Sequence, residues 1–107
     1  MILEVVVLDI TSGKEQEFET AFHEASDIIA GMAGYTSHQL QHCLEKRNRY
    51  LLLVQWETLE AHTIGFRGSG EYQEWKKRLH HFYDPFPVVE HYEMIYSNIA
   101  FGKSSLI

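Results

Sequence analysis

The stretch YLLLVQWETLEAHTIGFRGS, residues 50–69, carries most of the information about the fold of this chain. Its first seven residues are largely apolar on both alternating faces, which is typical of a strand in the middle of a sheet. Thr58 is a candidate N-cap for a short helix, and the glycines that follow end that helix. Ser69 can cap a second helix. The stretch therefore predicts a central strand followed by a broken helix.

Downstream of this stretch, apolar side chains recur with helical spacing. Tyr72, Trp75, Leu79 and Phe82 fall at i, i+3, i+7 and i+10, which predicts one buried stripe along the second helix. The segment DPFP at 84–87 ends the helix, because proline lacks the backbone donor and disfavours helix in the residue before it. Residues 88–97 are then predicted to form the last strand.

Upstream, the segment Ile2–Ile10 is rich in β-branched residues and predicts another central strand. Ser12 followed by Glu15 matches a capping box, so we expect a helix to start there. Apolar residues then repeat with helical spacing as far as Gly31 or Gly34, either of which can end the helix.

The segment Tyr35–Glu45 is more polar than the other predicted strands, which suits an edge strand. A charged turn joins it to the strand 50–56. The order strand, helix, strand, strand, broken helix, strand predicts an α+β, ferredoxin-like βαββαβ fold with one four-stranded antiparallel sheet. We expect a single domain over residues 1–97. Residues 98–107 are expected to be a tail that packs on the domain or on a dimer partner.

The central strands are apolar on both faces, whereas the predicted helices can cover only one. Leaving hundreds of Å² of apolar sheet in water would forfeit on the order of 10 kcal/mol, comparable to the stability of a whole domain. We therefore expect a homodimer in which two sheets pack face to face.

Composition narrows the possible partners and the location of the chain. The net charge of −6 over 107 residues repels nucleic acid and anionic lipid, so we expect no nucleic-acid partner and no membrane association. Apolar runs are far shorter than the roughly 20 residues that span a bilayer. The single cysteine, Cys43, cannot form an intrachain disulfide, which fits a reducing compartment. These observations favour a cytoplasmic protein.

The histidines are the first candidates for chemistry. His38 and His42 are four residues apart, but on a strand this spacing covers roughly 13 Å, so one ion cannot bridge them and we predict no metal site. His80 and His81 are neighbours on a helix, so at most one of them points inward. His62, and independently His91, can act as a general base because histidine titrates near neutral pH.

Aromatic residues are dense enough in the second half of the chain to line a cavity for a flat aromatic ligand. Arg67, beside a glycine, can hold an anionic oxygen. We assign to the substrate-binding walls the residues Trp56, Phe66, Trp75, Tyr92 and His38.

Taken together, these segments resemble the antibiotic biosynthesis monooxygenase family over nearly the whole domain. The residues that carry the resemblance are Val54–His62, Gly65–Ser69, Tyr72, Trp75 and Pro87–Tyr92. The family fold is a dimeric α+β barrel, which agrees with the packing argument.

The resemblance implies a cofactor-independent monooxygenase that oxidises a small aromatic substrate, such as a quinol, an anthrone or a polyphenol, with dioxygen. The pocket would deprotonate the substrate, and the resulting anion would pass an electron to dioxygen. His62 or His91 would be the base and Arg67 the anion partner. No cofactor is implied.

Two alternatives remain open. One is a binding or sensing dimer of the same fold without catalytic activity. The other is heme degradation, which a related branch performs with an asparagine on the first strand, a tryptophan after the third strand and a later histidine. This chain lacks the asparagine and has Phe66 and Lys76 near the other two positions, although His80 or His81 could still ligate iron under a shifted alignment.

Overall fold

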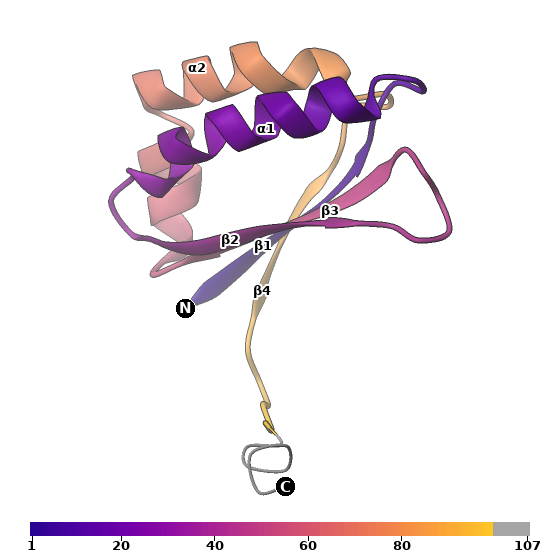
Figure 1. Cartoon of the computed structure of the whole chain (residues 1–107). Helices are drawn as coiled ribbons and strands as arrows, with labels where there is room; N and C mark the ends of the chain where they lie inside the picture. Colours follow the sequence, from indigo (N-terminus) through magenta and orange to yellow (C-terminus); the bar gives the residue numbers. More distant parts are fainter. Residues whose placement is uncertain (100–107) are drawn as a thin grey trace, which may run out of the picture.

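The computed structural model describes residues 1–99 and shows the predicted order of elements (Figure 1). The elements are β1 (Ile2–Asp9), α1 (Glu15–Ala30), β2 (Tyr35–His42), β3 (Arg49–Trp56), a π-helix η1 (Ala61–Phe66), α2 (Gly70–Leu79), a 3-10 turn η2 (His80–Phe82) and β4 (Val89–Glu93). The α+β, ferredoxin-like prediction is confirmed. Within residues 1–99 no helix has the length and apolar character needed to cross a membrane.

The four strands form one antiparallel sheet in the order β2-β3-β1-β4. The two strands predicted to be central, β1 and β3, are the inner pair, and the polar strand β2 lies at an edge as expected. Val6 of β1 lies opposite Leu52 of β3 and Val89 of β4, which fixes the register across the middle of the sheet.

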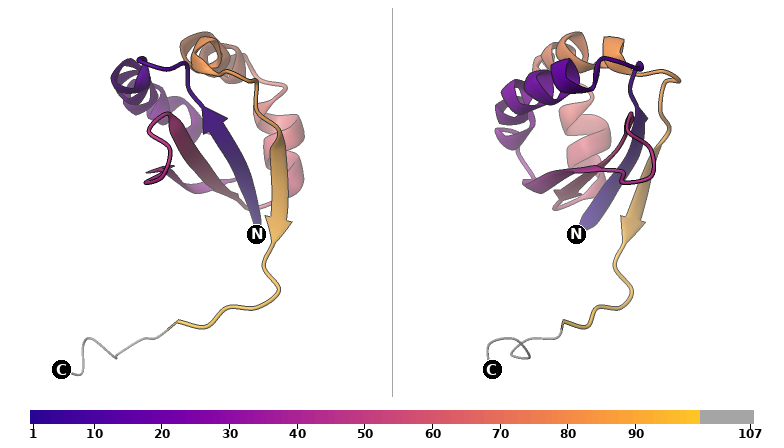
Figure 2. Two further views of the ribbon diagram at one scale, coloured as in Figure 1. Left: turned by 90° about the vertical axis from the view of Figure 1, so that its right-hand side faces the viewer. Right: turned by 45° about the vertical axis from the view of Figure 1, so that its right-hand side comes forward.

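Both long helices lie on one side of the sheet, and the core fills the space between these two layers (Figure 2). The core is built from the inner side chains of β1 and β3 and the facing sides of the helices. The largest fully buried side chains are Trp56, Tyr50, Phe18, Phe66, Leu8, Ile10, Ile29, Leu79 and Val54. The predicted stripe on α2 is confirmed, because Trp75, Leu79 and Phe82 are all buried and Tyr72 packs against the core.

The start of α1 differs from the expected capping box. The helix begins at Glu15 after Lys14, and the carboxylate of Glu15 accepts from the backbone N–H of Gly13 at 3.0 Å. Gly13 has φ +90°, so the chain turns sharply before the helix and leaves the Ser12 hydroxyl too far upstream to cap it. By contrast, the predicted Ser69 cap is present, since its hydroxyl accepts from Tyr72 N–H at 3.1 Å.

The last strand is shorter than the predicted segment 88–97. It pairs only with β1, and Glu93 lies opposite Ile2, the first residue of β1, so no partner remains for further residues. Residues 94–99 lead away from the domain (Figure 2) and expose the apolar side chains Met94, Ile95, Tyr96 and Ile99. Most of the predicted tail 98–107 lies outside the described residues.

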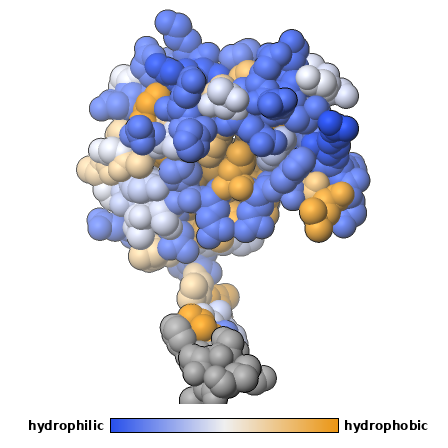
Figure 3. Space-filling view, in the orientation of Figure 1, coloured by the Kyte–Doolittle hydropathy of each residue, from blue (hydrophilic) through white to orange (hydrophobic). Residues whose placement is uncertain are grey.

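No helix of the described residues 1–99 lies on the other face of the sheet (Figure 2). On this outer face the central strands present side chains that are all partly exposed, namely Leu3, Val5, Val7, Leu51 and Leu53. In the space-filling view, polar residues cover the helices, and apolar residues appear below them and along the stretch after β4 (Figure 3). The chain thus exposes apolar surface on the side of the sheet away from the helices.

Candidate functional site

A cavity of about 360 Å³ lies between the inner face of the sheet and the helical layer. Its walls are mainly apolar. They come from the sheet, through Val6, Leu8, Leu52 and Val89, and from the helical side, through Ile29, Phe66, Trp75, Phe86 and Pro87. Polar groups reach the cavity from Glu4, His62, Arg67, Tyr72, His80 and Tyr83. Such a space suits a small, flat organic molecule that carries a few polar substituents.

The π-helix η1 brings two of these side chains to the cavity. His62 and Phe66 are four residues apart and both are buried, so they share the inward side of this short helix. The Thr58 hydroxyl accepts from Ala61 N–H at 3.1 Å, which confirms the predicted cap. The wide helical turn is closed by a bond from Arg67 N–H to the His62 carbonyl at 3.0 Å.

Glu4 is the buried acid of the site, and the sequence analysis did not select it. Its side chain lies on the inner face of β1 and is only 5% exposed. Its Oε1 accepts from Trp56 Nε1–H at 2.9 Å and lies 3.4 Å from His62 Nε2. One signal could have found it, because Glu4 is the single charged residue on the strand face that it shares with Val6, Leu8 and Ile10.

His91 belongs to the same cluster. It lies opposite Glu4 in the β1–β4 register and therefore points to the inner face of the sheet. Its Nε2 is 2.8 Å from His62 Nδ1, a hydrogen bond that joins edge strand β4 to η1. The two histidines proposed as alternative bases are thus in direct contact, with His62 at the cavity and His91 behind it.

The surroundings keep His62 uncharged. Burial, with the positive charge of Arg67 and the neighbouring His91, lowers the pKa of His62 to about 3. Burial raises the pKa of Glu4, although the Trp56 hydrogen bond and Arg67 act in the opposite direction. The 3.4 Å contact between them therefore joins a neutral imidazole to a carboxyl group, and it is not an ion pair.

Residues that follow α2 supply the remaining ring side chains of the cavity, namely His80, Tyr83 and Phe86. His80 lines the cavity and His81 is exposed, which confirms that only one of these neighbours points inward. Burial, together with the charge of Glu4, raises the pKa of Tyr83, so its hydroxyl stays protonated and can donate a hydrogen bond. Tyr72 was predicted to belong to the buried stripe and not to the site. Tyr83 and Phe86 were not predicted as site residues, because their direction depends on where α2 ends.

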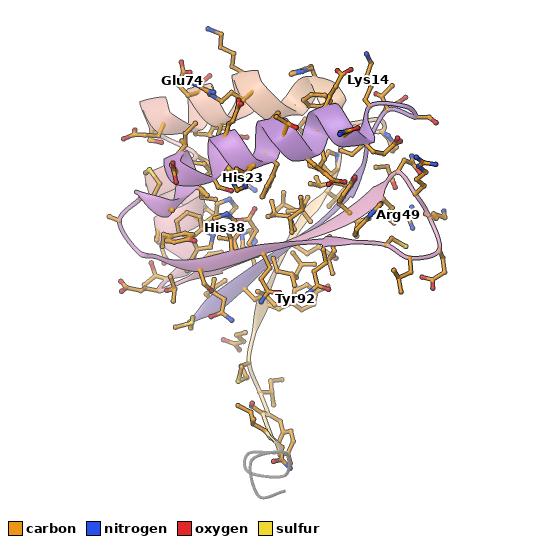
Figure 4. All side chains as sticks on the ribbon, viewed as in Figure 1. Lys14, His23, His38, Arg49, Glu74 and Tyr92 are labelled. Carbon is orange, nitrogen blue, oxygen red and sulfur yellow. The ribbon has the colours of Figure 1, made fainter. Side chains whose placement is uncertain are left out.

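Three of the residues expected in the substrate walls lie elsewhere. Trp56 is fully buried beneath the cavity, where it stacks on His62 with ring centroids 5.3 Å apart. His38 lies between β2 and α1 and contacts Tyr35 and the Ser26 hydroxyl (Figure 4). Tyr92 is 51% exposed on the outer face, because it lies opposite Leu3 and so has the reverse parity to His91. Phe66 and Trp75 do line the cavity.

Among residues 1–99, no three side chains of His, Cys, Asp or Glu come together in a way that could hold a metal ion. The polar groups of the cavity can instead accept a proton, through Glu4 and His62, and attract an anion, through Arg67.

The low pKa of His62 predicts a specific pH dependence of stability. The unfolded chain protonates His62 near pH 6.5, whereas the folded protein does so only near pH 3, so the folded state binds fewer protons and loses stability as the pH falls. We expect the free energy of unfolding of the wild type, relative to that of His62→Gln, to fall by up to about 1.4 kcal/mol for each pH unit between pH 6.5 and pH 3.

Urea unfolding of the wild type and of His62→Gln at several pH values between 6.5 and 3 measures the difference in their free energies of unfolding. The other groups that face His62, namely Glu4, Trp56, Arg67 and His91, are present in both proteins, so their own titrations largely cancel. Parallel stability curves for the two proteins would show that His62 is not held neutral.

Comparison with known proteins identifies the family. The family model described as antibiotic biosynthesis monooxygenase matches residues 1–78. This chain belongs to the antibiotic biosynthesis monooxygenase family. The resemblance drawn from the strand order and the segment around Trp56 is therefore confirmed.

Relatives within and around the family agree on the fold. The chain is 60% identical over 93 residues to the uncharacterized protein YczJ of Bacillus subtilis strain 168, covering 87% of this chain and 98% of YczJ. A structure from Bordetella bronchiseptica, provisionally named as an antibiotic biosynthesis monooxygenase, matches with TM-score 0.85 and 29% identity over 89% of this chain and 97% of that one. SnoaB of Streptomyces nogalater, described as a cofactor-independent oxygenase, matches with TM-score 0.71 and 18% identity over 92% and 95% of the two chains. At this identity, SnoaB shares the fold alone.

Proposed function

We propose that this protein is a cofactor-independent monooxygenase that oxidises a small aromatic substrate, of the quinol, anthrone or polyphenol kind, with dioxygen. The observation that carries the proposal is the cavity of about 360 Å³, whose apolar walls meet a polar end formed by Glu4, His62 and Arg67. Family membership supports it, as does the shared fold with SnoaB, a protein described as a cofactor-independent oxygenase.

The chemistry needs no external reductant when the substrate itself supplies the electrons. For a methylene carbon activated by neighbouring aromatic rings, both C–H bonds break, one oxygen atom becomes the new carbonyl and the other leaves as water. Removal of the first proton creates the electron-rich anion that transfers an electron to dioxygen. The protein has to accept this proton, hold the anion and exclude water.

The described side chains fit these tasks. His62 lies at the cavity between Glu4 and His91, so these three side chains together form the proton-accepting side of the site. Arg67 is exposed at the rim of the cavity, and its positive charge is felt by Glu4, His62 and His91. Arg67 therefore favours the anionic form of a bound substrate. Phe66 and Trp75 supply flat apolar walls for the rings.

We further propose that the protein works as a homodimer formed through the outer face of the sheet. This face carries leucine and valine side chains of the central strands, and no helix within residues 1–99 covers it. A second copy offers the same apolar surface, and a two-fold arrangement satisfies both copies at once. Such a dimer leaves the cavity free, because the cavity lies on the opposite face of the sheet.

Oxygen uptake tests the proposed function. Purified, chelator-treated protein is mixed with a panel of quinols, anthrones and catechols, and uptake is compared with autoxidation in buffer. We expect uptake by the wild type with at least one substrate and a loss of at least about 100-fold in the double variant His62→Ala, His91→Ala. The control is His81→Ala, an exposed histidine outside the cavity, which should retain the wild-type rate.

The outcomes separate the class of protein from the roles of its residues. Uptake that survives in the double variant would keep the oxygenase and contradict the assignment of these two histidines. No uptake with any substrate would contradict the proposed function and favour a binding or sensing dimer that retains an aromatic ligand without consuming oxygen.

A further inference from the structure

Glu4 has an unusual position for a carboxylic acid. It sits on a central strand and is 5% exposed, where an apolar side chain would pack at no electrostatic cost. Among residues 1–99, the contacts of its carboxyl group are made through Oε1, which receives the Trp56 Nε1–H at 2.9 Å and lies 3.4 Å from His62 Nε2. Glu4 also lines the cavity. A carboxyl group held in this way is available to a proton donor inside the cavity.

The contacts continue from Glu4 to the edge of the sheet. His62 presents Nε2 to Glu4 and Nδ1 to His91, whose Nε2 is 2.8 Å away. His91 is half-buried on β4, an edge strand, so the last member of the series reaches solvent. The 3.4 Å step is a few tenths of an ångström longer than an ordinary hydrogen bond. The three side chains therefore form a nearly continuous path from the cavity to water.

To act as a base, Glu4 has to be ionised before the reaction, and this state sets the proton positions along the path. Glu4 can only accept, so His62 carries its proton on Nε2 and accepts from His91 Nε2–H through Nδ1. The indole of Trp56 points to the same carboxylate oxygen. His62 and Trp56 thus donate to Glu4, and His91 donates to His62, which makes Glu4 the acceptor end of the path.

We propose that Glu4 is the group that accepts the substrate proton, and that His62 and His91 pass this proton to solvent at the edge of β4. This inference rests on the proposed function and assigns to Glu4 the role of base that was expected of His62 or His91.

In the first step the O–H or C–H bond of the substrate breaks and a new O–H bond forms on Glu4. Once protonated, Glu4 becomes a donor, so the two imidazoles first exchange tautomers and carry their protons on Nδ1. Glu4 then gives its proton to His62 Nε2, the His62 Nδ1 proton moves to His91 Nε2 and the His91 Nδ1 proton moves to water, which restores the resting tautomers. Both imidazoles stay neutral, and Glu4 ends as the carboxylate it was before the reaction. A neutral imidazole that exchanges tautomers suits this role, and burial keeps His62 neutral by lowering its pKa to about 3. The raised pKa of Glu4 brings this carboxyl group closer to the acidity of its donor.

The first test uses the protein without substrate, so it does not depend on the oxygenase reaction. In protein labelled with nitrogen-15 in histidine, lowering the pH through the pKa of Glu4 should change the ring-nitrogen shifts of His62 and His91 in one common step. Glu4→Gln should remove this step while keeping an oxygen acceptor for Trp56. The other groups that face the path, Arg67 and Tyr83, are unchanged in the variant. Ring shifts that titrate identically in both proteins would overturn the proposal.

The second test uses the rate of oxygen uptake. Glu4→Gln should lower kcat by about 100-fold or more with little change in KM, since it removes a base and leaves the cavity walls in place. His91→Ala should lower kcat by about 10-fold, and imidazole added to the solution should restore most of that loss by replacing the missing ring at the edge of the sheet. The control Glu74→Gln changes an exposed carboxylate that points away from the sheet on α2 (Figure 4) and should have no effect.

These results can be told apart from failure of the proposed function. A Glu4→Gln variant with the wild-type kcat, or a His91→Ala variant that imidazole does not restore, would overturn the path. A wild type that takes up no oxygen would overturn the proposed function. The nitrogen-15 titration would then decide on the path alone: a common step in the shifts of His62 and His91 would support it, and no such step would overturn it.

Discussion

Leu53→Asp is expected to convert the protein from dimers into monomers. Leu53 lies on the outer face of β3, opposite Val5 of β1 and Gln39 of β2, and the helices of the described part of the chain lie on the other side of the sheet. A carboxylate placed there would lose its water when two sheets meet. In a two-fold dimer each substitution occurs twice, so a cost of about 2 kcal/mol per site weakens association by roughly 1,000-fold.

Sedimentation velocity at micromolar concentration measures this change. The control is Ile64→Asp, because Ile64 is an apolar residue that is 69% exposed on η1, away from the outer face. We expect Ile64→Asp to remain dimeric. A monomeric wild type, or a Leu53→Asp variant that stays dimeric, would show that the outer face of the sheet is not the interface.

The second large effect concerns Gly34, where Gly34→Ala is expected to reduce the free energy of unfolding by about 3 kcal/mol. Gly34 has φ +82°, and a Cβ built on it would lie 2.6 Å from the Cβ of Ala61. The substitution therefore adds a steric clash to the backbone strain. Because Ala61 begins the helix that carries His62, this clash also acts on the site.

Gly13→Ala is the matched control for this prediction. Gly13 has φ +90°, but its added Cβ would meet no atom within 4 Å. Gly13→Ala should therefore lower the free energy of unfolding only by the backbone strain, about 1 kcal/mol. Urea unfolding at one fixed protein concentration measures both losses. Adding Ala61→Gly to Gly34→Ala should recover most of the difference, whereas equal losses for the two alanine variants would contradict the clash.

Much of the fold follows from patterns that extend over many residues. The two-sided apolar composition of the segments around Val6 and Leu52 identified the inner strands, and the polar alternation of β2 identified an edge. The hydroxyls of Thr58 and Ser69 fixed the starts of η1 and α2. Element ends were harder, because they depend on partners distant in sequence. Glu93 ends β4 only because β1 begins at Ile2.

The site was predicted only in part, since strand register decides which side chains face the cavity. His91 and Tyr92 are neighbours in sequence, yet one points to His62 and the other to the outer face. Spacing along a single strand cannot decide between these two, because a shift of one residue exchanges them. Glu4 was missed because its strand was interpreted as a central strand, largely apolar on both faces, with no functional role. The contact between His62 and His91 joins residues 29 positions apart and becomes visible only in the folded chain.

The activity proposed for this protein is the insertion of an oxygen atom from dioxygen into an aromatic substrate without a cofactor. The most direct measurement is mass spectrometry of the product formed by chelator-treated protein under oxygen-18 gas, using the substrate that gives the fastest oxygen uptake. We predict one oxygen-18 atom in each product molecule, at a rate well above autoxidation and strongly reduced in Glu4→Gln. Product that carries oxygen from water, or no product above the autoxidation background with any substrate, would contradict this account.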